Sequence, residues 1–299
     1  MNRIKIHLML LGFSVFTGAS FNLAKYTVSC FSPFTAAACR FGLAAGVLLL
    51  ILVITKRMDF SEIKRNAVWY LVLGVVGIFG FSAFFFVGLQ YTSSVNGALI
   101  MGLNPILTML LARVLLKERI TASRTAGVVL AFLGVTLVIS QGSLQVLDSL
   151  TFSRGDVLIL CGNVCWTVYG VGGRRYIRTG SPLSTTAYTM IVGALCLLAA
   201  SLFTTNPVPL PDIPLSAWGA IAFMALFTSV LGYLWWNKGI REIGAGRTSL
   251  FFNLVPVVTM AISALSGVPV SGYQITGAVL VIFGVLTASG VVRVQSLVK

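Results

Sequence analysis

The chain has 299 residues, of which 57% are hydrophobic and only 9% are charged. Soluble proteins carry roughly 25% charged residues to cover their surface, so this composition excludes a soluble globular domain. The mean hydropathy of +0.97 agrees, and the class indicated is a polytopic membrane protein surrounded by the lipid bilayer.

The chain contains a series of apolar stretches of the length that a membrane-spanning helix needs, about 20 residues. The connections between them are too short to hold a folded soluble domain. We therefore predict an all-α membrane protein with ten transmembrane helices. In chain order the expected spans are 7–25, 33–54, 67–90, 94–116, 121–140, 155–173, 182–203, 216–237, 246–266 and 273–292.

The basic residues fall on alternate connections. Of the 21 Lys and Arg residues, seventeen lie on one set of connections and termini. The opposite set holds Lys25 and Arg154, while Arg40 and Arg113 fall within spans. Because basic residues collect in cytoplasmic loops, we expect both termini to be cytoplasmic. This explains the net charge of +14 without a nucleic-acid partner.

The second half of the chain repeats the first at an offset near 150 residues. Each half, 1–145 and 150–299, contains five predicted spans, so the second half would be inserted with inverted topology. Such repeats are typical of secondary transporters, which bind substrate near the midplane. The matched pairs are Lys25 with Arg174, Pro33 with Pro182, Pro105 with Pro256, Gly127 with Gly277 and Gly134 with Gly284.

Several short motifs occur in the order expected of a known family. They are Cys39-Arg40-Phe41-Gly42-Leu43-Ala44-Ala45, Asn104-Pro105, Lys117-Glu118-Arg119-Ile120 and Gly155-Asp156. With these motifs the chain resembles the drug/metabolite transporter superfamily, with two EamA-type five-helix repeats. The second repeat departs from the family pattern at Val268-Pro269, where the family usually has Gly-Glu. The resemblance implies a bacterial inner-membrane transporter of small metabolites.

Polar side chains inside the spans are the candidates for contact with substrate, because exposing them to lipid is costly. A buried Arg40 guanidinium would bind a substrate carboxylate; the alternative is that it reaches the interface or backbone carbonyls. Asn22, Asn104 and Asn253 are candidates for hydrogen bonds to substrate, and the last two for capping freed backbone groups.

Two prolines and a set of aromatic residues complete the predicted site. Pro105 and Pro256 lie in the middle of spans four and nine, where a proline kink would serve either gating or packing. We expect the aromatic residues to line a cavity that accepts amphipathic compounds, although Trp and Tyr also form interfacial belts. They are Trp166, Tyr169, Tyr188 and Tyr233.

The sequence predicts neither an enzyme nor a cofactor or metal site. His7 is the single histidine, and the acidic residues fall in loops or at helix ends. We expect a secondary transporter that exports a small metabolite, an amino acid or a related amphipathic compound, by alternating access. An importer of the same architecture, and a membrane scaffold or regulatory subunit, remain the alternatives. The energy coupling and a homodimer are left open.

Overall fold

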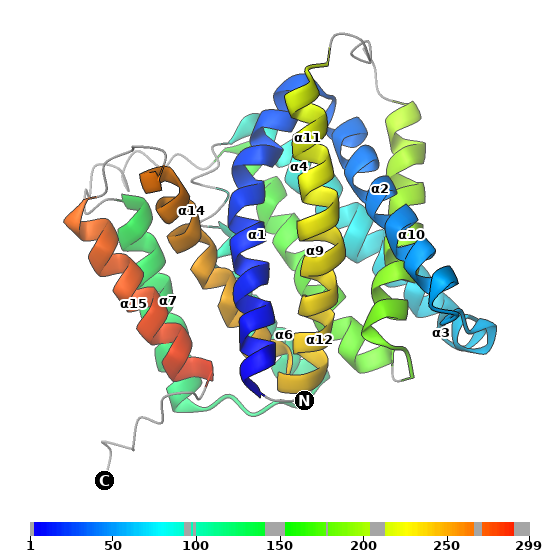
Figure 1. The fold of residues 1–299 in the computed structure, drawn as a ribbon. Helices are drawn as coiled ribbons and strands as arrows, with labels where there is room; N and C mark the ends of the chain where they lie inside the picture. The colour runs from blue at the N-terminus through cyan, green and yellow to red at the C-terminus, as the bar shows by residue number, and fades with distance from the viewer. Residues whose placement is uncertain are drawn as a thin grey trace.

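The computed structural model describes residues 3–92, 97, 100–140, 153–177, 179–203, 213–265 and 271–289. Throughout this part of the chain the regular structure is helical (Figure 1). Val268-Pro269 and the C-terminal basic residues Arg293 and Lys299 lie outside the described residues.

Six helical segments in the described ranges are long and apolar enough to cross a membrane. They are α1 (Arg3–Cys30), α2 (Pro33–Ile54), the run α3-η1-α4 (Phe60–Leu73, Gly74–Gly80, Phe81–Tyr91), α9 (Arg154–Tyr176), α10 (Pro182–Leu202) and the run α11-η3-α12 (Leu215–Phe223, Met224–Gly232, Tyr233–Ile243). These correspond to the first, second, third, sixth, seventh and eighth expected spans.

The remaining helices are shorter. They are α6 (Asn104–Leu115), α7 (Ala122–Ser140), α13 (Ala245–Thr248), η4 (Ser249–Asn253), α14 (Leu254–Leu265) and α15 (Gly272–Ser289). They fall in the fourth, fifth, ninth and tenth expected spans, so the all-helical prediction is confirmed and the count of ten spans stays a prediction.

Equivalent helices of the two halves start with the same chemistry. The Ser32 side chain accepts a hydrogen bond from the Thr35 amide before Pro33 opens α2, and Ser181 does the same for Ser184 before Pro182 opens α10. A serine side chain caps the free amide groups at the start of a helix. Proline fits the first turn because an N–H at that position has no acceptor within the helix, so nothing is lost when it is absent. This shared start explains the predicted match of the two prolines.

The two halves also share an irregularity. The third long helix of each half passes through a π-helical segment, η1 in the first half and η3 in the second, and their first residues lie 150 positions apart. Helices that correspond in the two halves pack against each other: α2 against α10, and α7 against α15 (Figure 1). These relations are expected of two related repeats facing each other.

Lys25 and Arg174, matched in the sequence, perform the same task in their own halves. Lys25 Nζ donates hydrogen bonds to the carbonyl oxygens of Leu89 and Thr92 at the end of α4. Arg174 Nη1 donates to those of Ile240 and Arg241 at the end of α12. The last carbonyls of a helix lack partners within it, so each cation caps a helix end.

The two prolines do not kink continuous helices, which corrects the expectation. A turn at Gly102–Leu103 ends the preceding helical turn, and α6 starts anew with Pro105 in its first turn. In the second half the 3₁₀ segment η4 precedes α14, and Pro256 is the third residue of α14. The first four amides of a helix have no intrahelical acceptor, so each proline is accommodated at a helix break.

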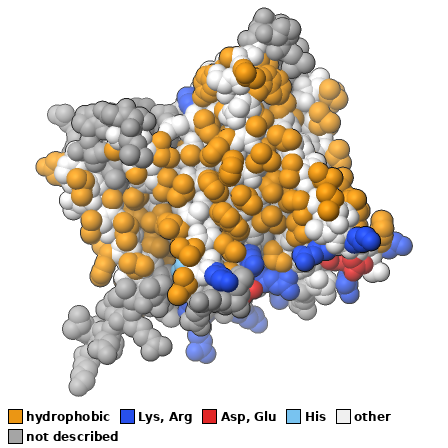
Figure 2. Space-filling model, viewed as in Figure 1, with side chains coloured by type: hydrophobic (Ala, Val, Ile, Leu, Met, Phe, Trp, Pro, Cys, Tyr) orange, Lys and Arg blue, Asp and Glu red, His pale blue; other side chains and the backbone are white. Residues whose placement is uncertain are grey.

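The outer surface has the pattern that a bilayer requires. Large apolar side chains are exposed on several helices, including Leu50 and Val53 on α2 and Leu195 and Leu198 on α10. Figure 2 shows apolar side chains over the sides of the molecule and Lys and Arg side chains along its lower edge. The apolar sides and the charged edge therefore divide the surface into lipid-facing and water-facing parts.

Candidate functional site

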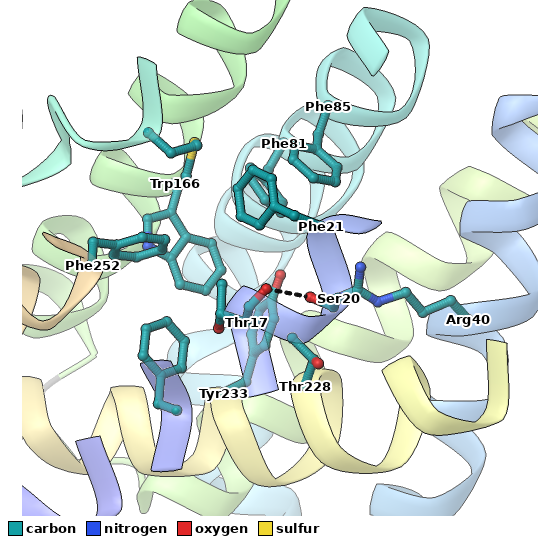
Figure 3. A pocket seen from close by; sticks show the side chains of 12 residues that line it. Thr17, Ser20, Phe21, Arg40, Phe81, Phe85, Trp166, Thr228, Tyr233 and Phe252 are labelled. Carbon is teal, nitrogen blue, oxygen red and sulfur yellow. Dashed lines mark hydrogen bonds between the residues drawn. The ribbon is translucent and has the colours of Figure 1, made fainter. Parts of the chain in front are cut away.

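A small cavity of about 30 Å³ lies between α1, α2, α4, α9, η3, α12 and η4 (Figure 3). Most of its lining is aromatic or aliphatic, with one cation and a few hydroxyl groups. The lining residues are Phe13, Thr17, Ser20, Phe21, Arg40, Phe81, Phe85, Met101, Trp166, Thr228, Tyr233 and Phe252. We call this the central cavity.

Arg40 reaches the central cavity from α2 with only 3% of its surface exposed. Its Nε donates to Ser229 Oγ at 2.9 Å, and its Nη1 lies 3.9 Å from Met224 Sδ. The guanidinium carbon lies 4.9 Å from the centre of the Phe41 ring. Among the described residues no carboxylate forms an ion pair with it. A buried charge is costly without a partner, and Ser229 is the one hydroxyl group that accepts from this guanidinium among the described residues.

The aromatic wall of the cavity is organised around Trp166 of α9. The centre of its ring system lies 4.7 Å from that of Tyr233 and 5.2 Å from that of Phe81. Phe252 and Trp236 lie 5.9 and 5.3 Å away by the same measure. Edge-to-face and tilted rings at such distances pack favourably, so the wall is a rigid surface that suits a flat apolar group.

Three polar groups of the lining have no hydrogen-bond partner within the part of the chain that the structure describes. They are Thr17 Oγ1, Trp166 Nε1 and the Tyr233 hydroxyl. By contrast, Ser20 Oγ donates to the carbonyl oxygen of Thr17 at 2.9 Å. A buried donor without a partner costs about 1–3 kcal/mol. These three groups line the same cavity as the Arg40 guanidinium.

A polar layer borders the cavity on the side of Tyr169. The Tyr169 ring lies 5.7 Å from the Trp166 ring and 5.9 Å from the Tyr233 ring. Its hydroxyl accepts a hydrogen bond from Asn237 Nδ2 at 2.7 Å, and the same amide nitrogen donates to Thr186 Oγ1 at 2.8 Å. Tyr169 therefore contacts the cavity wall with its ring and ties α9 to α10 and α12 with its hydroxyl.

Asn104 lies outside the cavity, at the break before α6. Its Nδ2 donates to Asn163 Oδ1 at 2.8 Å and to Thr167 Oγ1 at 3.2 Å. Asn163 Nδ2 in turn donates to the carbonyl oxygen of Ile100 at 2.7 Å. This network on α9 satisfies the backbone where the helix is interrupted.

The break in the second half is treated differently. Ser14 of α1 donates to the carbonyl oxygen of Phe251 at 2.7 Å, as Asn163 does for Ile100. Asn253, however, is fully buried, and neither its amide nitrogen nor its amide oxygen has a hydrogen-bond partner among the described residues. One break is thus secured by its asparagine and the other is not.

The structure brings together only some of the residues expected at the site. Arg40, Trp166 and Tyr233 line the central cavity, and Tyr169 contacts its wall. Asn22 is exposed and does not line the cavity. Tyr188 packs on Tyr70, whose hydroxyl donates to Glu62, and is likewise not among the lining residues.

Sequence reasoning missed several residues of the site. Thr17 and Ser20 sit inside the first apolar span, and Thr228 and Ser229 sit inside the eighth. Hydroxyl residues within a spanning helix are a usable signal, because they need a partner away from lipid. The phenylalanines of the lining had no such signal, since Phe is equally common on lipid-facing surfaces.

Comparisons with known proteins agree with this architecture. The model of the EamA-like transporter family matches residues 4–140 and again 153–290. A Bacillus subtilis protein named uncharacterized transporter YyaM is 62% identical over 98% of this chain and 96% of its own length. A Chlamydia muridarum protein named S-adenosylmethionine/S-adenosylhomocysteine transporter is 28% identical over 79% of this chain and 76% of its own.

A solved crystal structure has the same fold. Its chain is only 20% identical, but it superimposes with a TM-score of 0.77 and the match covers 97% of this chain and 98% of that one.

Proposed function

Because the chain belongs to the EamA-like transporter family, we propose that it is a secondary transporter that exports a small metabolite bearing a carboxylate and a flat apolar group. The observation that carries this proposal is the buried Arg40 guanidinium, which faces an aromatic cavity with no counterion among the described residues. Amino acids and their derivatives are the substrate class with this combination of groups.

The lining supplies each interaction that such a substrate needs. The guanidinium has five N–H donors in a planar fork that matches a carboxylate, and Nε alone is used by Ser229. The rings around Trp166 would stack on the flat group. Thr17 Oγ1 and the Tyr233 hydroxyl are available for the substrate's amino or hydroxyl groups. A scaffold protein would have no use for these unpartnered groups.

The name of the Chlamydia muridarum relative suggests compounds to test first. S-adenosylmethionine and S-adenosylhomocysteine each combine an amino-acid carboxylate with a flat adenine ring. We propose them as probes for this chain, because the guanidinium would bind the carboxylate and the aromatic wall the adenine. The relative is 28% identical to this chain, so other amino-acid derivatives belong in the same test.

We further propose that transport proceeds by alternating access between two inverted five-helix repeats, with both termini in the cytoplasm. The basic edge of the molecule supports this orientation, as do Lys25 and Arg174 as equivalent caps in the two halves. The breaks at Pro105 and Pro256 provide places where α6 and α14 can change direction without breaking regular hydrogen bonds. In this proposal the two breaks are the gates.

Metabolite release from intact bacterial cells tests the proposal. Cells overproducing the wild-type protein should release a set of compounds that share a carboxylate, as identified by untargeted mass spectrometry. Arg40→Ala should abolish the difference from empty cells. Arg113→Ala is the matched control, because Arg113 lies on the exposed side of α6, and it should release the same compounds as the wild type. Equal release by Arg40→Ala and wild type would contradict the proposed site.

A further inference from the structure

A second cavity, of about 270 Å³, opens where α9 and α12 end and α10 begins. It is distinct from the central cavity and shares no lining residue with it. Its lining residues are Gly170, Gly173, Arg174, Ile177, Gly180, Pro182, Thr185, Asn237, Ile240 and Arg241. We call this the vestibule.

The vestibule is positively charged, since its lining residues include two arginines and no acid. Arg174 forms an ion pair with Glu118, whose Oε1 lies 4.0 Å from Arg174 Nε. Glu118 is shared with Arg124, which approaches its Oε2 at 3.4 Å. Glu62 lies behind Gly180, where its Oε1 accepts the Tyr70 hydroxyl at 2.6 Å. Two guanidinium charges therefore face the cavity with only partial compensation.

Both guanidinium groups are held in place by the backbone. Arg241 Nη1 donates to the carbonyl oxygen of Gly180 at 2.7 Å, and Arg174 Nη1 donates to that of Ile240. Each anchor uses one nitrogen of the group, so other N–H donors remain for a ligand. A side chain fixed before binding loses less entropy when it binds, which favours recognition of a small carboxylate.

The vestibule also has room and a connection to the interior. A Cβ added at Gly173 would find only a Leu73 methyl carbon within 4 Å, at 3.9 Å, so this part of the wall is open. On the inner side, Asn237 lines the vestibule and donates to the Tyr169 hydroxyl. The Tyr169 ring contacts Trp166 of the central cavity. The Asn237–Tyr169 pair therefore links the two lining sets along α9.

We propose that the vestibule is a peripheral binding site for the carboxylate of the substrate, which Arg241 and Arg174 recruit before it passes the Asn237–Tyr169 layer to Arg40. This inference rests on the proposed transport of a carboxylate. It assigns the vestibule to the same face as the basic edge, so a substrate leaving the cytoplasm binds there first. The vestibule would raise the local concentration of anions and not of cations.

The charge of the vestibule can be measured without knowing the substrate. In a variant whose native cysteines are replaced, Gly173→Cys places one thiol in the open wall. Inside-out vesicles expose this face to negatively charged (MTSES) and positively charged (MTSET) methanethiosulfonate reagents. Each labelling rate is divided by the rate of the same reagent with a free thiol in solution. We expect this normalised rate to be higher for MTSES than for MTSET. Arg241→Gln should lower the anion-to-cation ratio by about threefold or more, and Arg241→Lys should preserve it.

A second arm of the same experiment tests whether the vestibule binds a carboxylate, as distinct from being positively charged. Millimolar indole-3-acetate should slow labelling of the thiol, while tryptophol, which carries a hydroxyl in place of the carboxylate, should not. Arg40→Ala should leave both results unchanged, so loss of export in that variant would concern the central cavity alone. A thiol that does not react, a ratio that is insensitive to Arg241, or absence of carboxylate-dependent protection would overturn the vestibule assignment.

Discussion

Asn104 lies at the helix break before α6 and Asn253 at the break before α14, and among the described residues only Asn104 of the two forms side-chain hydrogen bonds. Asn104 donates to Asn163 and Thr167 of α9, whereas both amide atoms of the buried Asn253 lack a partner. Asn104 directly precedes Pro105, whereas Asn253 lies three residues before Pro256, so the two asparagines are not counterparts and the two breaks are secured in different ways.

This difference predicts opposite effects on stability. Asn104→Ala removes the donor for the buried Asn163 oxygen and should destabilise the protein by about 1–3 kcal/mol. Asn253→Ala removes a group that is buried without partners, so the unfolding temperature should stay the same or rise. Thermal unfolding of the purified variants in detergent measures both. A large loss of stability in Asn253→Ala would contradict this account.

The prolines at the breaks should affect access to the cavity. Pro105→Ala and Pro256→Ala restore a backbone donor and allow the helix to extend through the break. We expect normal insertion, reduced transport and a bias toward opposite sides of the membrane. A single cysteine at Thr17 in the central cavity, labelled from each side in turn, reports the bias. Normal transport with unchanged labelling in both variants would mean that the prolines serve packing alone.

The pairing of α7 with α15 depends on glycine. A Cβ at Gly134 would lie 2.6 Å from the carbonyl oxygen of Gly277 and 2.7 Å from the amide nitrogen of Val281. Gly134→Leu should therefore separate these helices and lower the yield of folded protein on size-exclusion chromatography. Gly46→Leu is the control, because a Cβ there meets nothing within 4 Å. Equal yields of the two variants would show that the close contact is not needed.

The sequence predicted the all-helical membrane class and many of the positions where helices begin or pack closely. Capping serines, paired prolines and paired glycines carry positional information, and the structure uses them at matching places in both halves. Their physical roles are local, so they can be recognised without knowing what lies across the bundle. The match of Lys25 with Arg174 was similarly informative, because both cations cap helix ends.

The site was predictable only in part. Arg40 was found because a charge inside an apolar span is costly. Asn22 was expected to line the cavity, but helix rotation places it on the exposed side of α1, and rotation depends on packing that the sequence does not state. Trp236 is almost fully buried beside Trp166, although Trp residues in membrane proteins are often interfacial. The burial of Asn22 and Trp236 depends on which side chains of other helices they face, and the sequence does not give these partners.

The orientation in the membrane has its own test. In a background without native cysteines, Gly272→Cys should react with a membrane-impermeant maleimide added outside intact cells. Gly272 opens α15, and a Cβ there meets nothing within 4 Å. Ser61→Cys, exposed at the start of α3, should react only after the cells are opened. The reverse pattern would contradict cytoplasmic termini and the inverted second repeat.

The central claim is that Arg40 recognises the substrate and is not needed for folding. Arg40→Met replaces the buried guanidinium with an apolar side chain. The free energy of unfolding should fall by no more than about 1–2 kcal/mol, which is the loss of one hydrogen bond to Ser229. Arg40→Lys keeps the charge but not the planar fork, and we expect partial transport.

Counterflow in liposomes measures this claim most directly. Purified wild-type protein is reconstituted into vesicles loaded with unlabelled S-adenosylhomocysteine or, in parallel, with the carboxylates released by overproducing cells, and entry of the labelled compound is followed. We predict rapid counterflow of at least one carboxylate by the wild type, slower counterflow by Arg40→Lys, and none by a folded Arg40→Met protein. Counterflow by Arg40→Met at the wild-type rate would contradict the account.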